Sequence, residues 1–97
     1  MLDYLAIEAL DTVIRTGTFQ KAAEALHISA SAVSQRIAKL ELKLSARLII
    51  RGTPCRATDE AMMLMGHLEK VRQLECELVQ SVPEIDTLLQ PNNRRIR

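Results

Sequence analysis

The 97-residue sequence predicts a mainly α-helical fold with one short β-hairpin and a long helix after it. Three observations support this fold class. Apolar residues recur every three or four positions through most of the chain, as in helices that bury one face. A β-prone run at 48–50 precedes a turn that contains Gly52 and Pro54, as in a hairpin. Aromatic residues make up only 2% of the chain, so the core should be aliphatic.

The first two helices are predicted from their caps. Residues 3–15 form a helix with Asp3 at its N-cap and Gly17 in the left-handed position that ends a helix. Thr18 can then cap a second helix over 19–26. Two adjacent alanines in this second helix allow another helix to approach closely, which the tight corner after it requires.

The third helix begins after a corner of only three residues, 27–29. Ser29 and Ser31 are both suitable N-caps for it, and it continues to about Leu44. Its apolar residues have helical spacing and should face the core: Val33, Ile37, Leu40 and Leu44. Its outward polar residues are then Ser31, Ser34, Gln35, Lys39 and Lys43.

A hairpin and a fourth helix follow. Residues 48–50 and 56–58 are predicted to pair as the two short strands. Thr58 caps a long helix that Pro83 ends, and its first turn holds two acids that suit the helix dipole. One side of this helix carries Ala61, Leu64, Leu68, Val71, Leu74, Leu78 and Val82.

Charge is strongly segregated along the chain, although the net charge is only +1. Residues 36–56 carry six bases and one acid, whereas residues 57–86 carry seven acids and two bases. A basic block of this kind is typical of a surface that binds a polyanion. No apolar run approaches membrane-spanning length, and Cys55 and Cys76 lack the spacing of a metal site. We therefore expect a reduced, cytoplasmic protein with no membrane segment, metal or cofactor.

Two helices joined by a tight corner and followed by a hairpin have the layout of a winged helix-turn-helix, whose second helix enters the major groove of DNA. Gln35 could read adenine through its amide, and lysines further along could meet phosphates. Arginines flanking the hairpin turn could lie along the minor groove. The predicted DNA-contacting residues are Ser29, Ala30, Ser31, Ser34, Gln35, Arg36, Lys39, Lys43, Arg51 and Arg56.

The same residues are open to other interpretations than DNA binding. The serines could merely cap, the bases could be solvated, and Arg51 or Arg56 could pair with Glu41 or Asp59. The domain could also be a winged helix kept for protein interaction or dimerisation, without specific DNA binding. An enzyme is not expected, because Ser34 has no histidine base at a suitable spacing and there is no glycine-rich phosphate loop.

The stretch from Gly17 to Thr58 resembles the LysR family of bacterial transcription regulators, through residues that extend over the predicted helices and hairpin. The matching residues are Gly17, Phe19, Ala22, Ala23, Leu26, Ser31, Ala32, Val33, Ser34, Ile37, Leu40, Glu41, Leu44, Leu48, Arg51 and Thr58. The stretches SAVSQRI and TPCRAT are most similar to the lysine/arginine-export regulators of that family. Ala30, Ser45, Ile49 and Ala61 depart from residues usual in the family, and alanine at position 30 should weaken base readout there.

The resemblance implies a DNA-binding head at 1–58 and a linker helix at 59–82 that pairs with its twin in a homodimer. The dimer contacts would come from Leu64, Leu68, Val71, Leu74 and Leu78. Residues 83–97 would be a hinge or the start of an effector domain that this chain lacks. The implied partner is double-stranded DNA, and a small-molecule effector is implied only where a separate effector domain is present.

Overall fold

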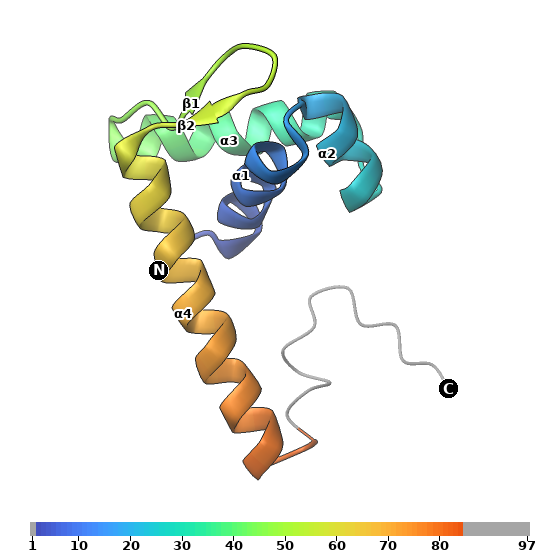
Figure 1. Cartoon of the computed structure of the whole chain (residues 1–97), viewed down its shortest axis with the longest axis vertical. Helices are drawn as coiled ribbons and strands as arrows, with labels where there is room; N and C mark the ends of the chain where they lie inside the picture. The colour runs from blue at the N-terminus through green and yellow to red at the C-terminus, as the bar shows by residue number, and fades with distance from the viewer. Residues whose placement is uncertain (1, 85–97) are drawn as a thin grey trace.

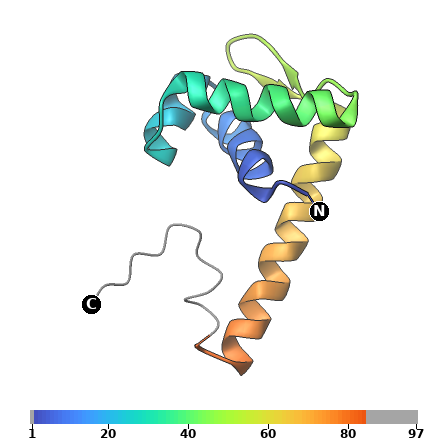
Figure 2. The same ribbon diagram turned by 180° about the vertical axis from the view of Figure 1, so that it is seen from behind.

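A computed structural model of the chain describes residues 2–84 and confirms the winged helix-turn-helix with a long helix after it (Figure 1). The elements, in order, are α1 (Tyr4–Thr16), α2 (Phe19–Leu26), α3 (Ala30–Leu44), β1 (Ile49–Ile50), β2 (Arg56–Ala57) and α4 (Asp59–Ser81). Helices α1, α2 and α3 pack together, and the hairpin lies along α3 (Figures 1 and 2). The strands are antiparallel, with Ile49 opposite Ala57. Helix α4 leaves the end of the hairpin and extends away from this body.

Side-chain caps start every helix, as the sequence predicts. Asp3, Thr18, Ser29 and Thr58 each accept a hydrogen bond from the backbone N–H three residues later. Ser29 rather than Ser31 is therefore the cap of α3. Such a cap stabilises a helix by about 1 kcal/mol, so four of them set the helix starts locally.

Left-handed residues end the first two helices and so create the sharp turns between them. Gly17 ends α1 with φ of 94°, a conformation that glycine adopts without steric cost. His27 ends α2 with φ of 59°, and its backbone N–H returns to the carbonyls of Ala23 and Glu24. His27 is thus a turn residue, in keeping with its predicted place in the corner.

The core lies where α1, α3 and the hairpin meet. Its fully buried large side chains are Ile7, Leu10, Val13, Val33 and Leu48. Ala22 and Ala23 are also buried, so α2 can pack closely on its neighbours. The expectation that Leu44 faces the core is wrong: it is 40% exposed, because the last turn of α3 lies beside the start of α4, where Leu44 and Met63 line an open hollow.

Helix α4 is fastened to α1 by apolar and polar contacts. Leu68 is only 5% exposed and belongs to the core. The Tyr4 hydroxyl lies 2.8 Å from Nε2 of His67, and the two rings stack with centroids 5.9 Å apart. Arg72 completes the attachment by ion pairs to Glu8 and Asp11 at 3.4 and 3.5 Å.

Within residues 2–84, no helix is both long enough and apolar enough to cross a bilayer. Both cysteines are free thiols, Cys55 buried and Cys76 exposed. Most of the predicted hinge, 85–97, lies outside the described residues.

Candidate nucleic-acid interface

Helix α3 exposes one continuous polar face. Successive residues of an α-helix are turned by about 100°, so Ser31, Gln35 and Lys39 follow one another along one side. All three are exposed, while Val33 and Ile37 are buried on the opposite side. The predicted outward orientation of these polar side chains is confirmed. Their contact with DNA stays a prediction.

The start of α3 offers fewer free groups than its sequence suggests. The Oγ atom of Ser29 accepts a hydrogen bond from the backbone N–H of Ala32 at 3.0 Å, so this oxygen is engaged in the cap. Ala30 is half-buried and packs against the core, which leaves its methyl group little access to a base. Ser31, by contrast, is exposed. Of the three residues predicted here, Ser31 is therefore the one that is exposed and is not engaged in the cap.

Basic side chains lie on both flanks of the exposed face, in different surroundings. Ser34 and Glu41 are half-buried on the flank next to the hairpin, where they line a small hollow together with Arg47 and Arg51. Arg36 and Lys43 lie seven residues apart on the other flank, about two helical turns along the axis. The face is thus bordered by basic side chains on both sides.

The hairpin arginines have different surroundings. The guanidinium carbon of Arg51 lies 4.3 Å from the centroid of the Phe19 ring, at the start of α2. Arg56 is exposed on β2. Among residues 2–84, neither arginine pairs with a carboxylate, including Glu41 and Asp59. The proposed alternative of a neutralising ion pair at the wing is therefore not what the structure contains.

Glu41 has a role that the sequence reasoning missed. Its carboxylate accepts hydrogen bonds from the backbone N–H groups of Leu48 and Ile49, at 2.8 and 3.3 Å. These contacts attach the root of the hairpin to α3. Two signals pointed to it: Glu41 is the single acid in the basic block 36–56, and it is among the residues that match the family.

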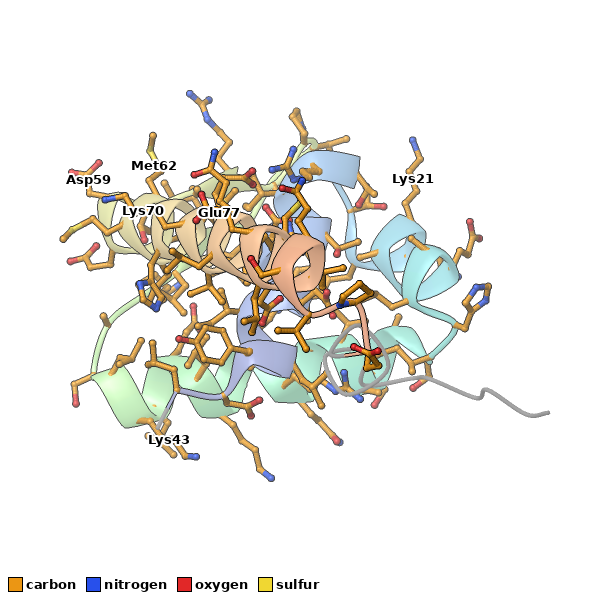
Figure 3. The ribbon with its side chains drawn as sticks, turned by 90° about the horizontal axis from the view of Figure 1, so that it is seen from below. Lys21, Lys43, Asp59, Met62, Lys70 and Glu77 are labelled. Carbon is orange, nitrogen blue, oxygen red and sulfur yellow. The ribbon has the colours of Figure 1, made fainter. Side chains whose placement is uncertain are left out.

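Lys43 of α3 and Asp59 of α4 point to different sides of the molecule. Figure 3 shows Lys43 pointing outward from α3, on the side away from α4, whereas Asp59 and Met62 of α4 point the opposite way. The basic block also includes the hairpin, and none of its side chains forms an ion pair within the described part of the chain. Lys70 of α4 points to the same side as Asp59, so the separation of charge in space is not complete.

The apolar stripe of α4 has a part that packs on the body and a part that stays exposed. Leu68 is buried in the core, and Leu64 and Val71 are partly buried. Leu74 and Leu78 are 63% and 44% exposed. Leu68 is therefore not available for the dimer contact predicted for it, because α1 already covers it.

Comparison with known proteins supports one family. The family described as bacterial regulatory helix-turn-helix protein, lysR family, matches residues 5–62 of the chain. The transcriptional regulator ArgP of Pseudomonas aeruginosa strain UCBPP-PA14 is 41% identical over 96 residues, which are 99% of this chain and 32% of that protein. The chain thus spans about a third of the length of this curated relative.

Solved structures agree in fold. ArgP from Mycobacterium tuberculosis superimposes with a TM-score of 0.79 and 38% identity, covering 86% of this chain and 32% of that one. Full-length LysG from Corynebacterium glutamicum gives a TM-score of 0.81 and 29% identity, covering 92% of this chain and 31% of that one. The relatives named here are regulators rather than enzymes. The matches to ArgP and LysG agree with the narrower resemblance, to the lysine/arginine-export regulators, that was based on the stretch TPCRAT. The chain therefore belongs to the LysR family of bacterial regulatory helix-turn-helix proteins.

Proposed function

We propose that this chain is the DNA-binding part of a LysR-type transcriptional regulator, which binds double-stranded DNA sequence-specifically through α3. One observation carries the proposal: α3 exposes a polar face bordered by basic side chains that form no ion pair within residues 2–84. A protein that neutralises phosphates needs such uncommitted cations. Membership of a regulatory family adds independent support.

In the proposed complex the residues divide into two groups. Gln35 lies near the middle of the exposed face and carries both an amide donor and an acceptor, which suits an adenine edge in the major groove. Lys39, Lys43 and the hairpin arginines would meet phosphates or the minor groove and would supply affinity without sequence preference. Ser29 and Ala30 contribute less, because one caps the helix and the other is partly buried.

The proposed assembly is a homodimer on an operator with two half-sites. Leu74 and Leu78 of α4 are exposed large apolar side chains, together with Val82. A matching α4 from a second copy would remove them from water. We place the DNA-binding head at 1–58 and the linker helix at 59–82. Two heads so joined would read a dyad whose half-sites lie about one helical turn apart.

The site of action would be the bacterial cytoplasm, where chromosomal DNA is present. An effector would act only through a further domain, since the described residues contribute a head and a linker. We assign no cofactor to the chain.

Fluorescence anisotropy with a labelled duplex from upstream of the gene, and with a scrambled duplex, tests DNA binding. The wild-type chain should bind both, and the upstream duplex more tightly. Lys39→Glu combined with Lys43→Glu should abolish binding to both duplexes at moderate salt. Lys70→Glu together with Lys21→Glu makes the same change in net charge away from the exposed face of α3 and should leave binding intact.

The alternative function, a winged helix used only for protein interaction, is favoured by the exposed apolar residues of α4. It predicts no retention on heparin or DNA at low salt, and equal behaviour of the two charge-reversed proteins. A wild-type chain that dimerises but does not bind either duplex would support this alternative.

A further inference from the structure

Phe19 is the one phenylalanine in the chain, yet it does not lie fully inside the core. It is the first residue of α2 and is half-buried. The guanidinium carbon of Arg51 lies over its ring at 4.3 Å from the centroid. This separation is well within the limit of about 6 Å for a cation–π contact. The contact joins the start of α2 to the end of β1.

The ring holds this arginine in a way that a carboxylate could not. An ion pair would fix the side chain but would also neutralise its charge. An aromatic ring attracts the cation through its quadrupole and leaves the net charge in place. A guanidinium has five N–H donors, and the ring cannot accept all of them in hydrogen bonds, so donors remain for a phosphate. Arg51 is accordingly both held and exposed.

The backbone around Arg51 is also held at two points. Glu41 accepts hydrogen bonds from the backbone at the root of the hairpin. On the far arm, the backbone N–H of Cys55 donates to the carbonyl of Gly17 at 2.8 Å, two residues before Phe19. Arg51 therefore lies on a hairpin whose two arms are attached to the helical body.

The same hollow connects Arg51 to the proposed DNA-binding face. Phe19, Ser34, Arg47 and Arg51 all line it. Ser34 belongs to the flank of α3 that faces the hairpin. A phosphate that approaches this flank would meet the guanidinium without a search through its side-chain conformations. Immobilising a long side chain on binding costs conformational entropy, and a pre-positioned one avoids part of that cost.

We propose that Phe19 is a positioning residue for DNA binding, whose ring holds the Arg51 guanidinium beside Ser34 where it meets a backbone phosphate. That the phosphate belongs to DNA rests on the proposed function. The ring–guanidinium contact belongs to the free protein and can be tested without DNA.

A double-mutant cycle tests the role in binding. Phe19→Leu should weaken binding roughly two- to fivefold on upstream and scrambled duplexes alike, because a phosphate contact carries no sequence information. Combined with Arg51→Gln, it should bind no more weakly than Arg51→Gln alone. Phe19→Tyr keeps a ring and should bind like the wild type. Arg56→Gln is the matched control, and its loss should add fully to that of Phe19→Leu.

Additive losses from Phe19→Leu and Arg51→Gln would overturn the inference, as would equal losses in the leucine and tyrosine variants. Unchanged binding in Arg51→Gln would overturn the inference alone and leave the proposed function standing. A wild-type chain that binds neither duplex would overturn both.

Proton NMR of the free chain tests the contact directly. The ring current of the aromatic side chain at position 19 should shift the δ protons of Arg51 upfield, both in the wild type and in Phe19→Tyr. Random-coil positions for these protons in the wild type would refute the ring–guanidinium contact. This measurement on the wild type stands even if Phe19→Leu fails to fold, which its thermal unfolding would reveal.

Discussion

Helices α3 and α4 are both capped by a hydroxyl side chain and both amphipathic, yet they leave opposite kinds of side chain uncommitted. On α3, most of the apolar stripe is buried, through Val33, Ile37 and Leu40. The basic side chains of α3, by contrast, form no ion pair within residues 2–84. On α4, Arg72 is already paired with α1, while Leu74 remains exposed. We infer that each helix exposes the side chains that its proposed partner would contact: a polyanion for α3, and an apolar surface for α4.

The exposed surface of α3 is not polar along its whole length. Leu42 is 80% exposed near the end of α3, and Leu44 is partly exposed beside it. Leu44, Met63 and Leu64 line a second hollow where α3 meets α4. The division between a polar and an apolar surface therefore runs across the last turn of α3 and not between the two helices as wholes.

The largest effect is expected from the part of α4 that belongs to the body. Leu68→Ala should lower the free energy of unfolding by about 2–5 kcal/mol, because it removes buried methyl groups and leaves a cavity against α1. Urea denaturation followed by circular dichroism measures this. Leu42→Ala makes the same chemical change at an exposed site and should cost less than about 0.5 kcal/mol. Similar losses in the two variants would mean that α4 does not pack on the body as described.

The free part of α4 should govern association. Leu74→Glu should raise the dimer dissociation constant at least tenfold, because it places two charges in an apolar contact, at a cost of more than about 1.4 kcal/mol. Sedimentation velocity at micromolar concentrations measures the change. Gln73→Glu adds the same charge one residue away and should leave the dimer largely intact. A wild-type chain that is monomeric over this range would contradict the proposed role of α4.

The exposed face of α3 should govern sequence preference. Gln35→Ala should cost about 1–3 kcal/mol on the upstream half-site and almost nothing on a scrambled duplex. Val33 and Ile37 face inward, so this change should not disturb the core. Anisotropy titrations at matched salt measure both affinities. Equal losses on the two duplexes, or none on either, would show that α3 does not read bases through Gln35.

The smallest effect is expected from single lysines on that face. Lys39→Ala or Lys43→Ala should weaken binding modestly and to the same extent on every duplex. Each should also flatten the slope of log affinity against log salt by about 0.9, the value for one phosphate contact. Titrations at four or more salt concentrations measure this slope. A changed sequence preference in either variant would contradict the assignment to phosphate.

Most of the fold could be predicted from the sequence because its signals are short-range. Asp3, Thr18 and Thr58 cap helices through backbone groups three residues away, and Gly17 ends α1 through its own conformation. The outward direction of Gln35 and Lys39 also followed from helical periodicity alone. By contrast, the sequence left two caps open for α3, since Ser29 and Ser31 satisfy the same local rule.

The sequence by itself determined where the helices begin, which face of α3 carries the polar residues, and that a basic block borders that face. Only the tertiary structure decided which leucines of α4 are covered, that Glu41 binds the hairpin backbone, and that Arg51 lies on Phe19. The physical reason is the separation along the chain of the residues that interact. A cap or a helical stripe depends on residues within about one turn, whereas these contacts depend on how the helices cross, which no single segment of sequence specifies.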